Sequence, residues 1–247
     1  MKRLMYVILG LCCVSPVAWA QEAEKTAESS EAVEILKKVD AAAKKVNAAK
    51  YDVTYKGTGE ADSKTPAVEG KAVLAGWSKN TVEKFRIDVT MKRPGSSEAT
   101  ELSAGSDGED YWLIDHTAKT AYEDIDPAVL GRVGGTAMRA ALVAEFVHSE
   151  PFSDEINGKK QELLGSEKIG DEDCYKIKVV YASGAQEAIW HFAKKDFLPR
   201  ARLDSRQGQE GGSQRTITNL VVDPKLDEEL FKFKLPEGYK KSDDFAP

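Results

Sequence analysis

The sequence predicts a β-rich α+β fold, in which one N-terminal helix precedes about eleven antiparallel strands that curl into a barrel or half-barrel. Three observations predict it: helical spacing of apolar residues near the N-terminus, strict alternation after Ala49, and short turns of Gly, Asp, Asn or Ser between the alternating runs. The chain has 247 residues, 41% of them hydrophobic, which is enough for a real core. A formal net charge of −6 argues against nucleic acid as a partner.

Residues 1–20 have the pattern of a secretory signal peptide. Lys2 and Arg3 form a basic start, Leu4–Val14 is apolar, and Ala18-Trp19-Ala20 offers small residues for cleavage. The apolar run is shorter than the roughly 20 residues of a membrane span. We therefore expect export with cleavage after Ala20, which removes two basic residues and changes the net charge from −6 to −8.

The cysteine content indicates a domain that is stabilised by its hydrophobic core and not by disulfides. Cys12 and Cys13 leave with the signal segment, and Cys174 remains alone. One cysteine forms no intramolecular disulfide. We expect Cys174 to be a small buried hydrophobe; a nucleophile or an intermolecular bridge are the alternatives.

The mature chain divides into a flexible polar leader over residues 21–29, a domain over residues 30–242 and a tail over residues 243–247. Ser30 is a suitable N-cap for a helix, with acidic residues in the first turn. Apolar residues then recur at spacings of three and four, namely Ala32, Ile35, Leu36, Val39, Ala42, Ala43 and Val46. This spacing predicts an amphipathic helix that lies on a sheet.

Alternation of apolar and polar residues predicts the strands. Tyr51, Val53 and Tyr55 alternate with polar residues, and so do the apolar residues from Phe85 to Met91. Each strand therefore has one buried face and one solvent-exposed face. Similar runs occur at Val68–Trp77, Ala99–Ser103, Asp110–Ile114, Lys119–Glu123, Gln161–Lys168, Tyr175–Tyr181, Glu187–Phe192, Pro199–Ser205 and Arg215–Val221.

The segment Thr136–His148 is apolar almost all round, because only Arg139 and Glu145 are charged before His148. A helix of this kind must be buried on most sides, and about 13 residues are too few to span a bilayer. We expect it on the concave face of the curved sheet. It is either a permanent part of the core or a plug that an apolar ligand displaces.

No motif for catalysis or for a cofactor occurs: the G-x-S-x-G, H-E-x-x-H, P-loop and dinucleotide-binding patterns are absent from the sequence. His116, His148 and His191 lie far apart, so we expect neither a metal ion nor a cofactor. The sequence predicts a protein that is not an enzyme, with Cys174 and His191 as the alternative catalytic pair. The strands carry more aromatic residues than one covering helix needs, which indicates a cavity.

Several motifs resemble the LolA/LolB-like superfamily of periplasmic outer-membrane lipoprotein carriers. Ser106-Asp107-Gly108, Tyr111–Ile114 and Tyr122-Glu123-Asp124 are similar to one strand pair of that family. Trp190–Pro199 is similar to its strand, turn and Leu-Pro step, and the residues from Leu226 to Gly238 resemble its closing motif. The opening helix and the mid-chain helix occur in the same order, so the resemblance covers residues 30–242.

The resemblance implies an unclosed antiparallel β-barrel whose apolar concave face is lidded by helices and accommodates acyl chains. It implies a periplasmic monomer that carries or chaperones lipoprotein acyl chains or another lipid, with a membrane-protein donor or acceptor. A sensor of the same fold that docks on a membrane protein is the alternative. We expect the ligand on Tyr55, Phe85, Ile87, Val89, Met91, Trp112, Met138, Leu142, Phe146 and Trp190.

One family feature is missing from this chain. The family places an Arg-Pro step before the strand that here contains Phe85, and that arginine latches the lid to the barrel. This chain has Trp77-Ser78-Lys79-Asn80-Thr81 instead, and Lys79 is the nearby basic substitute. The resemblance therefore does not carry this latch over.

Overall fold

The alternating segments form eleven strands in the computed structural model, which describes residues 16–78, 81–146 and 148–243. They are β1 (Ala48–Gly59), β2 (Ala67–Ser78), β3 (Thr81–Lys92), β4 (Ala99–Ser106), β5 (Tyr111–Asp115), β6 (Thr120–Asp124), β7 (Lys160–Ile169), β8 (Glu172–Val180), β9 (Gln186–Ala193), β10 (Pro199–Arg206) and β11 (Gly211–Val222). A further strand, β12 (Lys240–Lys241), is too short to produce an alternating pattern. The prediction of about eleven strands is confirmed.

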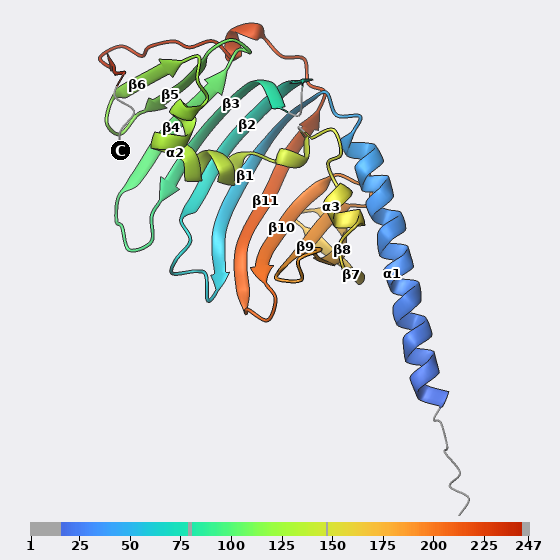
Figure 1. Ribbon diagram of the computed structural model, residues 1–247. Helices are drawn as coiled ribbons and strands as arrows, with labels where there is room; N and C mark the ends of the chain where they lie inside the picture. The colour runs from blue at the N-terminus through green and yellow to red at the C-terminus, as the bar shows by residue number, and fades with distance from the viewer. Residues whose placement is uncertain (1–15, 79–80, 147, 244–247) are drawn as a thin grey trace, which may run out of the picture.

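The strands form a single open sheet in the order β12-β6-β5-β4-β3-β2-β1-β11-β10-β9-β8-β7. Two meanders, β1 to β6 and β7 to β11, meet where β1 pairs with β11. Neighbours are antiparallel except for β12, which runs parallel to β6. The sheet curves without joining its edges, β7 and β12 (Figure 1). The unclosed antiparallel barrel that the resemblance implies is therefore confirmed.

Helix α1 (Pro16–Ala43) begins earlier than the sequence predicts. Residues 21–29, the predicted flexible leader, belong to the helix, so Ser30 is not its N-cap. Ala, Glu and Lys are frequent in this segment and favour helix, and neither Gly nor Pro interrupts it. The apolar face is confirmed from Ala32 onward. It packs against β7 and the short helix α3 (Ser153–Ile156), while the N-terminal end of α1 extends away from the sheet (Figure 1).

The predicted signal segment lies mainly outside the described residues. Residues 1–15 are not described, and Pro16–Ala20 form the start of α1. Cleavage after Ala20 stays a prediction. Lys79, Val147 and residues 244–247 also lie outside the described residues. Within the described part of the chain, no helix combines the length and the hydropathy of a membrane-spanning segment.

The mid-chain helix is displaced toward the N-terminus relative to the prediction. Helix α2 (Ala128–Ala141) starts just after Pro127, where the Asp126 carboxylate accepts a hydrogen bond from the Ala128 N–H at 2.8 Å. It ends at Ala141, the backbone of the next residue, Leu142, is extended, and a 3₁₀ turn, η1 (Ala144–Phe146), follows. We call residues 128–146 the lid. The predicted helix over Thr136–His148 is therefore wrong in its bounds, because the backbone breaks inside the apolar run.

The lid lies on the concave face of the sheet, as the sequence predicts (Figure 1). Helix α2 packs against β1 to β6. Ala137, Met138, Ala140, Ala141 and Phe146 of the lid are buried in the main core cluster, together with the buried side chains of α1 and of β1 to β4, β8 and β9. The core is therefore the space between the concave face and the segments that cover it.

The opposite, convex face carries a second, smaller core under the C-terminal segment. Trp112, Ile114 and Ala121 form it, with Phe233 and Tyr239 packed against them. The Trp112 indole N–H donates to the Phe231 carbonyl at 2.8 Å, just after the 3₁₀ turn η2 (Glu228–Leu230). The placement of Trp112 in the concave binding face is therefore wrong. Alternation along β5 turns Tyr111 and Leu113, not Trp112, toward the main core.

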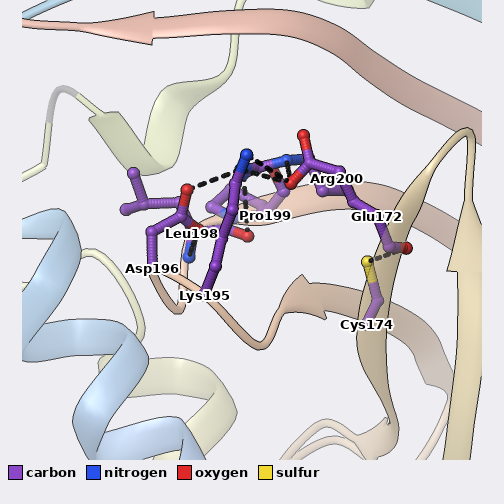
Figure 2. Close-up of polar contacts among 7 residues, drawn as sticks. All are labelled: Glu172, Cys174, Lys195, Asp196, Leu198, Pro199 and Arg200. Carbon is purple, nitrogen blue, oxygen red and sulfur yellow. Dashed lines mark hydrogen bonds and ion pairs between the residues drawn. The ribbon is translucent and has the colours of Figure 1, made fainter.

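A buried arginine joins β8 to the β9–β10 turn (Figure 2). Arg200 is 2% exposed. Its guanidinium donates to Glu172 at 3.0 Å, to Asp196 at 2.6 Å and to the Leu198 carbonyl at 3.2 Å. Burial disfavours the charge, but the hydrogen bonds that Arg200 donates to Glu172 and Asp196 outweigh it and raise the pKa of Arg200. A charge that is bonded on several sides stabilises this fold only while its partners are present.

We predict that Arg200→Ala lowers the free energy of unfolding by about 3 kcal/mol, because two carboxylates and a backbone turn lose their common donor. Lys195→Ala is the matched control, since the Lys195 ammonium also contacts Glu172, at 3.0 Å, but its side chain is 63% exposed. The control costs less than about 1 kcal/mol. Urea denaturation measures both. Equal losses in the two variants would contradict a special role for the buried arginine.

Candidate functional site

The floor of the concave face consists of rows of apolar side chains that run across neighbouring strands. One row contains Tyr51, Ala72, Ile87 and Ala104, which lie opposite one another on β1 to β4. The next contains Val53, Gly70, Val89 and Leu102. Apart from Gly70, which has no side chain, the residues of both rows are buried. Ala72 and Ala104 are small side chains on β2 and β4, and helix α2 packs against both strands.

The structure brings together the predicted ligand-binding residues other than Trp112. Phe85, Ile87, Val89, Met91, Met138, Phe146 and Trp190 are buried in the main core cluster, and Tyr55 and Leu142 pack against it. They come from the sheet floor, from the lid and from β9. Floor and lid therefore bury each other's apolar surface. Ligand binding by these residues stays a prediction.

Tyr51 on the floor fixes the break in the lid. Its hydroxyl donates to the Ala141 carbonyl at 3.0 Å and accepts a hydrogen bond from the Val143 N–H at 3.1 Å. These are the backbone groups on either side of Leu142, where α2 ends. Burial raises the pKa of Tyr51, so the hydroxyl stays protonated and able to donate. The hydroxyl thus takes the place of helical hydrogen bonds in an apolar environment.

Arg215 on β11 holds the same end of the lid. Its guanidinium donates to the carbonyls of Ala140 at 2.9 Å and of Arg139 at 2.8 Å. Carbonyls at the C-terminal end of a helix have no partner within the helix and carry partial negative charge, so a cation is favourable there. Arg215 thus attaches the lid to the sheet, although the chain lacks the Arg-Pro step of the resembling family.

An ion pair completes the attachment of the lid. Glu145 of η1 accepts a hydrogen bond from Arg202 of β10 at 2.7 Å. Arg202 also contacts Asp204 at 2.7 Å and the Tyr181 hydroxyl at 3.2 Å. Burial disfavours the charge of Arg202, but Asp204 and Glu145 outweigh it and raise its pKa. The lid is therefore held at its C-terminal end by Tyr51, Arg202 and Arg215.

A buried aromatic cluster covers the other half of the concave face. Phe152, just before α3, lies edge-on to Trp190 and Phe192, with ring centroids 5.4 Å from each. Tyr181 donates from its hydroxyl to Glu155 of α3 at 2.7 Å. Burial raises the pKa of this carboxyl group. Helix α3 is a single turn, too short to produce a periodic pattern, and for that reason the sequence does not predict it.

The groups considered for catalysis have structural partners. Burial raises the pKa of the Cys174 thiol, which disfavours a thiolate nucleophile. His191 contacts Glu167 at 3.3 Å, and burial lowers its pKa. On the convex face the Ser103 hydroxyl lies 2.8 Å from His116 but donates to Asp88 at 2.6 Å. In the described part of the chain, no group of three or more His, Cys, Asp or Glu residues is arranged to hold a metal ion.

The chain belongs to the family described as "Predicted periplasmic protein (DUF2092)", whose model matches residues 32–243. The predicted periplasmic location is thereby confirmed. A comparison with curated proteins finds no match.

Solved structures of similar fold include MucB, with a TM-score of 0.50 and 11% identity over 83% of this chain and 64% of MucB. They also include lipoprotein LppX of Mycobacterium tuberculosis, with a TM-score of 0.47 and 12% identity over 80% of this chain and 98% of LppX. A LolA superfamily protein from Nitrosomonas europaea has a TM-score of 0.35 and 14% identity over 82% of this chain and 97% of its own. The predicted LolA/LolB-like resemblance is confirmed at the level of the fold.

We predict that Tyr51→Phe loosens the lid without unfolding the sheet. The variant leaves the Ala141 carbonyl and the Val143 N–H without their partner, which costs about 1–3 kcal/mol. Hydrogen exchange read by mass spectrometry is expected to show roughly tenfold faster exchange or more in lid peptides, with little change in β8 and β9. Tyr175→Phe is the control, because the Tyr175 ring stacks on Phe197 instead of contacting the lid. Unchanged lid protection in Tyr51→Phe would refute the role of this hydroxyl.

Proposed function

We propose that this periplasmic protein is a non-enzymatic carrier or chaperone that shelters the acyl chains of a lipoprotein, or of another lipid, on its concave face. One observation carries the proposal. The apolar floor is covered by a lid of short segments, with an extended break at Leu142, and not by a second sheet. A cover of this kind can leave the floor while the sheet stays intact.

The energetics favour exchange between the lid and an acyl chain. Each methylene group that leaves water for an apolar environment contributes about 0.8 kcal/mol, and no covalent chemistry is needed to hold the chain. Met138 and Phe146 of the lid occupy the surface that the ligand needs. Closed and loaded protein are then two states of one apolar surface, and the ligand shifts the equilibrium between them.

The attachments of the lid are suited to this exchange. Tyr51 and Arg215 bind backbone atoms at the end of α2, and Arg202 binds a single carboxylate of η1. These polar contacts lie at one end of the lid, while α2 itself meets the floor through apolar side chains. A membrane protein that delivers or accepts the lipid completes the proposed route, as the resemblance implies.

Binding of 1,6-diphenylhexatriene tests the proposal, because this neutral probe fluoresces in apolar surroundings. We predict saturable binding to the purified mature protein, and lipid that copurifies with it and is detected by mass spectrometry. A natively folded protein that binds neither the probe nor any lipid would exclude the proposed function. Stoichiometric recovery of a membrane protein in place of lipid would favour the sensor of the same fold.

The lid variant sharpens the test, because a lid that competes for the floor lowers the apparent affinity. We predict that Tyr51→Phe binds the probe more tightly than the unmodified chain, by up to about tenfold, although it is less stable. Fluorescence titration of this variant and of Tyr175→Phe measures the effect. An affinity that falls in proportion to stability would show that the lid is a permanent part of the core.

A further inference from the structure

Two arginines lie opposite each other in the middle of the concave face. Arg202 of β10 pairs in register with Arg215 of β11. The same row continues to Trp190 on one side and to Tyr55 and Val68 on the other. A cationic pair thus interrupts an otherwise apolar row. Charges in such a place cost free energy unless anions or hydrogen-bond acceptors surround them.

The lid supplies much of the compensation for this pair. Arg215 binds the Arg139 and Ala140 carbonyls, and within the described residues no carboxylate forms a salt bridge with it. Arg202 binds Glu145 of the lid and Asp204 of its own strand, and its guanidinium lies 4.6 Å from the centroid of the Trp190 ring. When the lid leaves the floor, both arginines lose acceptors at once.

Glu145 is an imperfect partner for Arg202. The side chain of Glu145 is 9% exposed, and only its Oε1 atom bonds the guanidinium. Its Oε2 atom is buried without a hydrogen-bond partner. A carboxylate with one unsatisfied oxygen in an apolar environment loses part of what it gains from the ion pair. An external anion that uses both arginines would satisfy this site better than Glu145 does.

A polar cavity gives access to Arg202 from the side. It has a volume of about 820 Å³ and lies between α3, the β8–β9 turn and the ends of β10 and β11. Its lining is mostly polar: Arg202 and Arg206 are the basic residues, Asp154, Glu187 and Asp204 are the acidic ones, and Tyr181 is among the neutral ones. This volume falls in the range of small-molecule sites. A polar cavity thus lies next to an apolar floor. A lipid requires this arrangement, because its headgroup is polar and its acyl chain is apolar.

We propose that Arg202 and Arg215 bind the anionic headgroup of the lipid, a carboxylate or a phosphate, and that this headgroup displaces Glu145 from Arg202. The acyl chain then lies on the apolar floor beside them. The inference rests on the proposed function and adds the class of ligand: a lipid with one negative charge. Asp204 remains beside Arg202 after the lid has moved. The two arginines and Asp204 together then carry a net charge of +1.

Matched ligands test the inference. Oleate and oleyl alcohol have the same chain, but only oleate has a charged carboxylate. Phosphatidylglycerol and diacylglycerol with the same acyl chains form the second pair, in which only phosphatidylglycerol has a charged phosphate. Each displaces bound 1,6-diphenylhexatriene in a titration at a pH well above the pKa of carboxylic acids. We predict that at least one anionic ligand binds about tenfold more tightly than its neutral counterpart. The pair that shows the preference identifies carboxylate or phosphate.

Arginine variants locate the preference. Arg202→Gln and Arg215→Gln are expected to bring the ratio of the two affinities close to one, as measured on samples whose circular dichroism is native. Arg215→Lys keeps the charge but loses the planar guanidinium, so we expect it to retain part of the preference for the anionic ligand. This variant replaces the glutamine variants if they do not fold. Arg93→Gln removes an exposed arginine of the β3–β4 turn and is the control for net charge.

The lid carboxylate gives a test by gain of affinity. Any ligand that moves the lid separates Glu145 from Arg202. Only an anionic headgroup must then also compete with the freed Glu145 carboxylate for Arg202, so Glu145→Gln raises the affinity for the anionic ligand more than for the neutral one. Glu150→Gln, at an exposed position after the lid, is the matched control.

Equal affinities within both ligand pairs, or a preference that survives in every variant of Arg202 and Arg215, overturn the headgroup inference alone, since the probe still binds. An equal gain for both ligands in Glu145→Gln overturns the competition between Glu145 and the headgroup. No binding of the probe overturns the proposed function as well.

Discussion

The apolar concave face of an unclosed sheet needs a cover, and this requirement shapes the rest of the molecule. A closed barrel buries its inner side chains against one another, and a sandwich buries them against a second sheet. Here β7 and β12 remain edges, and α1, the lid and the segment around Phe152 cover the face. The cover is built from short pieces, so its stability depends on a few attachments to the floor.

Those attachments explain why the lid breaks where it does. A continuous helix over the apolar run would satisfy its own backbone hydrogen bonds. The structure instead ends α2 at Ala141 and uses the Tyr51 hydroxyl and the Arg215 guanidinium for the backbone groups released there. A tyrosine on β1 and an arginine on β11 therefore set the end of a helix that lies between them in the sequence.

The limits of sequence-based prediction follow from this long-range control. Strand positions are predictable because alternation is local, and the buried run Phe85, Ile87, Val89 and Met91 lies where that pattern places it. The face to which Trp112 turns and the pairing of Arg202 with Arg215 depend on register, which one strand alone does not reveal. Glu145 can be recognised in the sequence, because it is a charged residue within an apolar segment. Its partner Arg202 lies more than fifty residues away, and no sequence pattern marks it as the partner.

A charged pair in the floor also bears on how a carrier releases its ligand. If the floor were wholly apolar, the gain from burial would grow with chain length, and long chains would leave slowly. In the proposed carrier the lid opposes this, because Glu145 and the carbonyls at the end of α2, which bind Arg202 and Arg215 in the structure, would compete with a headgroup for the same arginines. Rebinding of the lid restores these polar contacts and buries the floor in one step. The same residues that recognise a ligand would then return the protein to its closed state.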